Sequence, residues 1–106
     1  MSEPIHVSLD FFAAEVESFP GTVLIDFWAE WCMPCRMMAP IFEDLAKSRD
    51  DAKFCKVNVD ENPDLAMKFG IDAIPAIVAV KGGRYLDKSV GYTDRDKLES
   101  FLEENL

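Results

Sequence analysis

The residues best suited to chemistry in this sequence are two cysteines, Cys32 and Cys35, which are separated by Met33 and Pro34. Two thiols at this spacing can join in a small disulfide and separate again, which moves two electrons. Chance alone would place two of three cysteines at this spacing roughly once in twenty chains of this length. The pair therefore predicts thiol-disulfide exchange.

The same spacing also occurs in one half of a zinc site, which needs further ligands. The remaining soft ligands are Cys55 and His6, and they do not form a second pair in the sequence. We therefore expect no metal and no other cofactor. The thiols themselves would be the only redox group.

The cysteine pair lies between a predicted strand and a predicted helix. Residues 22–29 are almost continuously apolar, which is typical of a strand covered on both faces. Residues 35–47 carry apolar side chains at helical spacing, interrupted by Pro40, which should bend the helix. The pair would occupy the first helical turn, where Pro34 is well suited. Because unpaired N–H groups and the helix dipole favour a thiolate there, we expect the Cys32 sulfur to be exposed and largely ionised.

The rest of the chain alternates between short strand and helix patterns. Gly82 and Gly83 predict a hairpin turn between the last two strands. Helix-linked strands pair in parallel and hairpin strands antiparallel, so the order predicts an α/β three-layer sandwich. Its mixed five-stranded sheet would be flanked by about four helices. The further strands are expected over residues 4–7, 53–59, 76–80 and 84–90, and the further helices over 9–17 behind a Ser8 cap, over 63–69, and after a cap at Asp94.

Composition and charge narrow the class of protein. The 106 residues, of which 49% are hydrophobic, suffice for one core, so we expect a single domain over residues 1–106. A net charge of −9 argues against nucleic-acid binding, which needs clustered Lys and Arg. No stretch is apolar enough to span a bilayer, and the N-terminal sequence does not resemble an export signal. Three cysteines do not suit a disulfide-stapled secreted protein, so we expect a cytoplasmic protein without a membrane partner.

One acidic residue, Asp26, interrupts the apolar strand at residues 22–29. Burial would raise the pKa of its carboxyl and allow it to exchange a proton near neutral pH. The alternative is that Asp26 only satisfies a backbone group or a strand edge. Residue chemistry alone leaves both interpretations open.

Several sequence blocks resemble bacterial thioredoxins. They are DFWAEWCMPC followed by RMMAPIFEDLA, KVNVDENP at residues 56–63, FGIDAIPA at 69–76, and GGR with a later Gly91. They occur in family order and nearly family spacing, so the resemblance to the thioredoxin family covers essentially the whole chain. It implies the thioredoxin fold and a monomeric protein-disulfide reductase. Its partners would be disulfide-containing client proteins and a thioredoxin reductase, with a nicotinamide and a flavin, that restores the dithiol.

The resemblance also implies roles for the catalytic residues. Cys32 would attack a protein disulfide, and Cys35 would resolve the mixed disulfide. Asp26 would accept the proton of Cys35 through a water, with Lys56 as its nearby charge partner. An ordinary solvated strand lysine is the alternative for Lys56.

The implied substrate-binding surface surrounds the cysteine pair. Ile74 would offer backbone hydrogen bonds to an extended peptide, and Pro75 would be cis and pack against the disulfide. Gly91 would leave room for the peptide. The whole expected surface consists of Trp31, Met33, Pro34, Ile74, Pro75 and Gly91.

Four further positions are either expected in the core or depart from the usual thioredoxin sequence. Trp28 is expected to be a core aromatic and Cys55 a small buried hydrophobe. Met33 stands where thioredoxins usually have glycine, and Ala76 where threonine is common. Because the residues between the cysteines control the redox potential, the resemblance does not determine how reducing the protein is. Two alternatives stay open: an oxidase or isomerase of the same fold, and a binding subunit whose redox chemistry is incidental.

Overall fold

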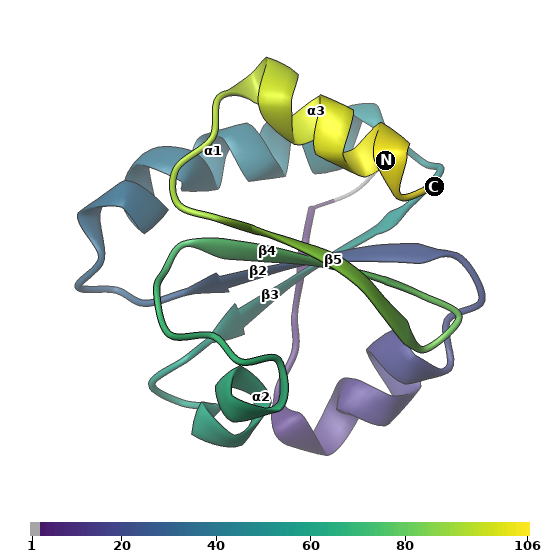
Figure 1. Cartoon of the computed structure of the whole chain (residues 1–106), viewed down its shortest axis with the longest axis horizontal. Coiled ribbons are helices and arrows are strands. Elements are labelled where there is room, and N and C mark those ends of the chain that lie inside the picture. Colours follow the sequence, from purple (N-terminus) through teal and green to yellow (C-terminus); the bar gives the residue numbers. More distant parts are fainter. Residues whose placement is uncertain (1–2) are drawn as a thin grey trace.

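A computed structural model describes residues 3–106 and places a central sheet between two layers of helices (Figure 1). Helices α1 (Met33–Ser48) and α3 (Arg95–Glu104) cover one face, whereas α2 (Pro63–Lys68) and the N-terminal helical segment cover the other. The expected three-layer α/β sandwich is therefore confirmed. The expected domain and the N-terminal sequence both include residues 1 and 2, which lie outside the described residues.

The sheet is mixed and has five strands, as the sequence predicts. They are β1 (Ile5–His6), β2 (Thr22–Trp28), β3 (Lys53–Asn58), β4 (Ala76–Lys81) and β5 (Arg84–Val90). The strand order is β1-β3-β2-β4-β5, with β3 parallel to β1 and β2, and β4 antiparallel to β2 and β5. Because β2 is the central strand, side chains on both of its faces are buried, which explains its continuous apolar sequence.

Helix α1 begins earlier than the sequence predicts. Its first residue is Met33 because Cys32 caps the helix: the Cys32 sulfur accepts a hydrogen bond from the backbone N–H of Cys35 at 3.2 Å. Pro40 lies inside the helix, as expected. The cysteine pair therefore forms the N-terminus of α1 itself.

The other two helices begin where the sequence predicts. Asp94 caps α3, and its carboxylate accepts a hydrogen bond from the backbone N–H of Lys97 at 2.9 Å. Helix α2 begins at Pro63, whose missing N–H costs nothing in the first turn. Gly70 follows α2 in the left-handed region, with φ of 63°, a common way to end a helix.

The expected regular helix over residues 9–17 is wrong. The chain forms a short 3-10 helix, η1 (Leu9–Phe11), followed by a π-helical segment, η2 (Ala13–Glu17). Ser8 does not cap it; the backbone N–H of Leu9 donates instead to Oδ1 of Asn62, at 3.0 Å. At the other end, Ser18 donates from both its N–H and its hydroxyl to the carbonyl oxygen of Ala13. These bonds replace the regular helical ladder.

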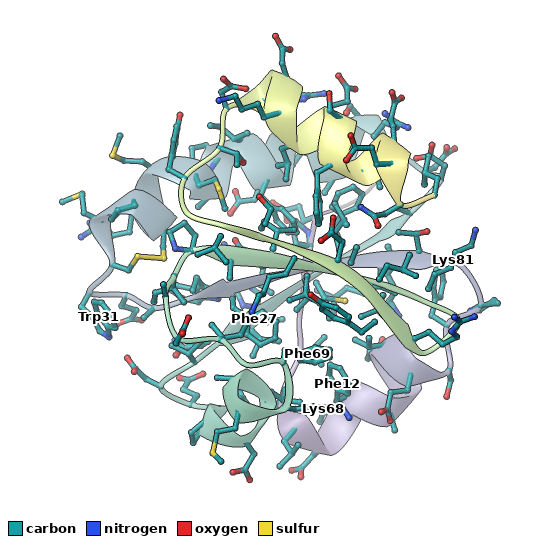
Figure 2. The ribbon with its side chains drawn as sticks, in the orientation of Figure 1. Phe12, Phe27, Trp31, Lys68, Phe69 and Lys81 are labelled. Carbon is teal, nitrogen blue, oxygen red and sulfur yellow. A yellow bond between two sulfur atoms is a disulfide. The ribbon has the colours of Figure 1, made fainter. Side chains whose placement is uncertain are left out.

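Alternate side chains of β2 contact opposite halves of the core. Phe27 packs on the α2 face, where its ring centroid and that of Phe12 each lie 5.7 Å from the centroid of Phe69 (Figure 2). Leu24 joins the apolar cluster beneath α1 and α3. Because Asp26 follows Leu24 by two residues, its carboxyl lies on the same face of the sheet, under α1.

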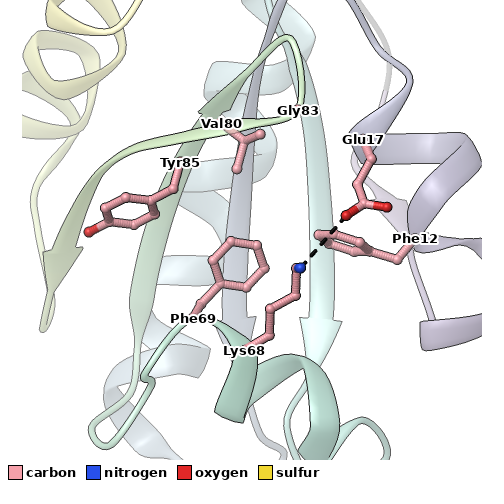
Figure 3. A pocket seen from close by; sticks show the side chains of 7 residues that line it. All are labelled: Phe12, Glu17, Lys68, Phe69, Val80, Gly83 and Tyr85. Carbon is pink, nitrogen blue, oxygen red and sulfur yellow. Dashed lines mark ion pairs between the residues drawn. The ribbon is translucent and has the colours of Figure 1, made fainter.

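The predicted hairpin turn is present at Gly82 and Gly83, with φ of 57° and 80°. A Cβ added at Gly83 would lie 2.9 Å from the carbonyl oxygen of Glu17; both residues are labelled in Figure 3. For a Cβ at Gly82, the nearest atom within residues 3–106 would be the carbonyl oxygen of Pro20, at 3.9 Å. We expect Gly83→Ala to lower the free energy of unfolding by about 2–3 kcal/mol, from left-handed strain plus the close contact. Gly82→Ala, the control, should cost only about 1 kcal/mol from strain alone. Urea unfolding of both variants measures this, and equal losses would contradict the role of the Glu17 contact.

Candidate active site

Cys32 and Cys35 form a disulfide at the N-terminal end of α1, close to Trp31 in Figure 2. Their Cα atoms are 5.3 Å apart. The backbone N–H of Cys35 points at the Cys32 sulfur, which also faces the positive end of the helix dipole. In the reduced protein these interactions stabilise a thiolate on Cys32.

The expectation that the Cys32 sulfur is exposed is wrong for the disulfide form. Cys32 is only 4% exposed and Cys35 3%. Trp28, Val59 and Ile74 pack against the pair and cover it. A client must therefore approach within contact of these apolar side chains before its sulfur can reach Cys32.

The loop before β4 forms one wall of the site. The Ile74-Pro75 peptide bond is cis, as the resemblance implies. The carbonyl oxygen of Ile74 lies 3.8 Å from the Cys32 sulfur. Gly91 donates its N–H to the carbonyl oxygen of Pro75 at 2.7 Å, and a Cβ at Gly91 would meet no atom of residues 3–106 within 4 Å. The expected substrate-binding residues of two distant segments thus lie next to one another.

The rim beside the disulfide carries exposed apolar side chains. Trp31 is 70% exposed, and its indole N–H donates to Oδ2 of Asp60 at 2.8 Å. Met33 is also exposed, and Pro34 lies beside it on the first turn of α1. Trp31 and Ile74 line the same cavity of about 370 Å³. The rim therefore offers both an apolar surface and a hollow beside the sulfur pair.

Asp26 is buried within β2, with 1% of its surface exposed. Burial raises the pKa of its carboxyl to about 7; the positive charge of Lys56 opposes the rise, and the negative charge of Glu43 adds to it. Its Oδ1 accepts no hydrogen bond from any of residues 3–106. A carboxyl with this pKa can gain and lose a proton at neutral pH.

Lys56 is directly opposite Asp26 in the pairing of β2 with β3. Its ammonium forms an ion pair with Glu43 of α1, with Nζ 3.6 Å from Oε2. Within residues 3–106, Asp26 forms no ion pair with Lys56 inside 4.0 Å. Lys56 was expected as the charge partner of Asp26; it is buried rather than solvated, and its ion-pair partner is a different carboxylate, Glu43.

A family model described as Thioredoxin matches residues 3–104. The chain belongs to the thioredoxin family. It is 47% identical to the thioredoxin of Alicyclobacillus acidocaldarius over 79% of this chain and 81% of that protein. It is 41% identical to thioredoxin 1 of Nostoc sp. and 39% identical to the thioredoxin of Pseudomonas aeruginosa, each over the full length of both chains.

Membership of the thioredoxin family and a cysteine pair joined in a disulfide together support thiol-disulfide oxidoreductase chemistry. The two positions at which this sequence departs from the usual thioredoxin pattern, Met33 and Ala76, lie in different surroundings. Met33 is exposed at the rim, whereas Ala76 is fully buried at the start of β4. Met33 is therefore the departure that changes the surface beside the disulfide.

Glu43 and Asp60 are two residues of the site that the sequence analysis missed. Glu43 does have a signal in the sequence, because positions 35, 39 and 43 follow one another at helical spacing and therefore share one face of α1 with Cys35. Asp60 lies in the loop after β3 and meets Trp31 only through the tertiary fold. Nothing in the sequence around Asp60 indicates that contact.

Cys55 and Trp28 were both expected to be buried residues of the core. Cys55 is fully buried in the opposite half of the core, and burial raises the pKa of its thiol to about 11, so it is the small hydrophobe that was expected. Trp28 differs from expectation: it is half-buried rather than core. Its ring packs against the cysteine pair, and Nζ of Lys56 lies 5.1 Å from its ring centroid.

Another pocket, of about 320 Å³, lies between η2, α2 and the β4-β5 hairpin (Figure 3). Phe12, Phe69 and Tyr85 line it, and Lys68 forms an ion pair with Glu17 at its edge, at 3.7 Å. None of its lining residues belongs to the site predicted from the sequence.

Within residues 3–106, no helix is both long and apolar enough to cross a membrane.

Proposed function

We propose that this protein reduces protein disulfides by reversible dithiol-disulfide exchange at Cys32 and Cys35. The observation that carries the proposal is the disulfide at the start of α1, with the Cys35 N–H bonded to the Cys32 sulfur. That arrangement stabilises the attacking thiolate and keeps the second thiol beside it. Family membership supports the same activity.

The exchange proceeds in two steps. In the reduced protein, the Cys32 thiolate attacks one sulfur of a client disulfide; the client S–S bond breaks, and its other sulfur leaves as a thiolate. Cys35 then loses its proton and attacks the Cys32 sulfur of the mixed disulfide. The second client sulfur leaves, the client has gained two electrons, and this protein is left in the disulfide form seen in the structure.

Asp26 is the proton acceptor for Cys35 in this scheme, through a water. Its carboxyl lies on the face of β2 that α1 covers, and its pKa of about 7 suits proton exchange at neutral pH. Lys56 contributes the nearby positive charge, which limits how far burial raises that pKa. The Oδ1 of Asp26 has no hydrogen-bond partner among residues 3–106, which supports this role over one in which Asp26 only satisfies a backbone group.

An extended client peptide binds across the rim in this proposal. The backbone of Ile74 forms hydrogen bonds with it, as an added strand would, while Pro75 and Gly91 line the same side. Trp31, Met33 and Pro34 supply the apolar contacts from the other side. The cavity between Trp31 and Ile74 supports this placement.

We also propose the setting in which the protein works. Residues 1–106 act as one domain and as a monomer in the cytoplasm. The family implies disulfide-containing clients and a thioredoxin reductase that restores the dithiol. The acidic net charge of −9 favours partners with basic surfaces around their docking sites.

The reduction potential of the Cys32/Cys35 pair tests the direction of the reaction. Equilibration with a glutathione or dithiothreitol redox buffer should give about −270 mV, the value known for thioredoxin itself. A value near about −120 mV, as for a strong disulfide oxidant, would instead support the oxidase alternative. The variant Met33→Gly, which restores the residue usual in the family, measures how much of any difference Met33 causes.

A further inference from the structure

The Lys56 ammonium has two carboxylates in its surroundings, and these differ greatly in exposure. The Lys56 side chain is 8% exposed, and its Nζ lies 3.6 Å from Oε2 of Glu43, whose side chain is 41% exposed. The other carboxylate, that of Asp26, is 1% exposed and belongs to the residue opposite Lys56 in the sheet. Trp28 covers Lys56 as well, with its ring centroid 5.1 Å from Nζ.

A buried lysine beside a buried aspartate would ordinarily pair with it. Such a pair would hold the aspartate in its charged form, because an opposite charge at contact distance favours ionisation. Here the ion pair goes to Glu43, which reaches over from α1, and the Oδ1 of Asp26 has no partner in the described part of the chain. Lys56 therefore forms its ion pair with the half-exposed carboxylate of Glu43 and not with the buried carboxylate of Asp26.

We propose that Glu43 is a positioning residue that holds the Lys56 ammonium away from the Asp26 carboxyl and so keeps that carboxyl able to exchange a proton with Cys35. This inference rests on the proposed function of Asp26. Glu43 disfavours a negative charge on Asp26 in two ways. Its own negative charge repels that of an ionised Asp26, and its ion pair restrains the buried Lys56 ammonium, which would favour ionisation.

The charges that act on Asp26 support this assignment. Lys56 of β3 lowers the pKa of Asp26 and Glu43 of α1 raises it, while burial is the largest influence. Removing the Glu43 charge therefore takes away one contribution that raises the pKa of Asp26. It also breaks the ion pair that restrains Lys56, whose positive charge can then lower the pKa of Asp26 further. Both changes favour an ionised Asp26, which is a weaker base and carries a proton for a smaller fraction of the time near pH 7.

The test is a direct titration of the Asp26 carboxyl, followed by its side-chain ¹³C NMR signal in the oxidised protein. Glu43→Gln should move the midpoint to lower pH by about one pH unit, a tenfold change in the ionisation constant. Asp44→Asn is the matched control, because it removes the same charge from the next residue of α1, whose carboxylate pairs with Arg95 at the surface. It should move the midpoint by less than about 0.3 pH unit. Glu43→Asp, which keeps the charge, should restore the midpoint toward that of the unaltered protein.

The pH dependence of client-disulfide reduction separates the two parts of the proposal. If Glu43 positions Lys56 and Asp26 serves Cys35, the pH profile of Glu43→Gln shifts in the same direction as the titration. A titration midpoint that Glu43→Gln leaves unmoved would overturn the inference. A midpoint that moves without any change in the pH profile would uphold the control of Asp26 by Glu43 and would contradict the proposed function of Asp26.

Discussion

Replacing Cys35 with serine is expected to make the protein accumulate covalent complexes with its clients. Cys32 keeps its position at the N-terminus of α1 and still attacks a client disulfide, but no neighbouring thiol remains to release the product. Turnover should fall at least about 1,000-fold, because an intramolecular thiol with a very high effective concentration is lost. Non-reducing electrophoresis and mass spectrometry detect the trapped mixed disulfides.

Cys32→Ser should lose the same activity without forming complexes, since the attacking sulfur is gone. Cys55→Ser is the control, because its thiol is buried on the other face of the sheet and its pKa is raised to about 11. It should turn over clients normally. Equal trapping by Cys32→Ser and Cys35→Ser would refute the roles assigned to the two thiols.

The variant with both Cys32 and Cys35 replaced by serine distinguishes an enzyme from a binding subunit. It should bind clients weakly and reduce none of them. Full biological activity of this variant would support the alternative in which the rim around Trp31 binds a partner and the redox chemistry is incidental.

Asp26 is expected to make the protein less stable as the pH rises from about 4 to about 7. Burial raises the pKa of its carboxyl from the ordinary value of 3.8 to about 7, so over this interval the folded protein holds a proton that the unfolded chain has released. Stability then decreases with pH, because the unfolded state binds fewer protons. The full effect corresponds to about 4 kcal/mol and is complete above the folded pKa.

Asp26→Asn should remove this pH dependence. The amide has the same shape but does not ionise, so the variant should match the unaltered protein near pH 4 and exceed it in the free energy of unfolding by about 4 kcal/mol at pH 8 to 9. Urea unfolding of the oxidised proteins, in which neither Cys32 nor Cys35 titrates, measures the difference. Asp44→Asn, at the surface, serves as the control and should show no such crossover. A difference between Asp26→Asn and the unaltered protein that does not change with pH would show that Asp26 is ionised in both states.

Much of the fold was predictable because it depends on local patterns. The continuous apolar run of β2 indicated a central strand, the glycine pair indicated the hairpin, and Asp94 indicated the start of α3. Each of these signals acts over a few residues, through strand burial, backbone conformation or a capping bond. The cysteine spacing likewise predicted the disulfide chemistry without any knowledge of the fold.

The N-terminal segment shows where local patterns were insufficient. Its apolar spacing predicted a regular helix with a Ser8 cap, but the first N–H of that segment bonds to Asn62, which is 53 residues away in the chain. Such a contact supplies the hydrogen bond that a local cap would have supplied. Propensity is a weak signal wherever a tertiary contact can replace it.

By itself, the sequence determined the reacting sulfurs, their place at a helix start, and the elements that carry them. Only the tertiary structure decided that Ile74 covers Cys32, that Asp60 bonds to Trp31, and that Lys56 pairs with Glu43 rather than with Asp26. The physical reason is distance along the chain. The environment of a sulfur or a buried carboxyl depends on side chains from several strands and helices, and these meet only when the sheet is assembled and α1 packs on it.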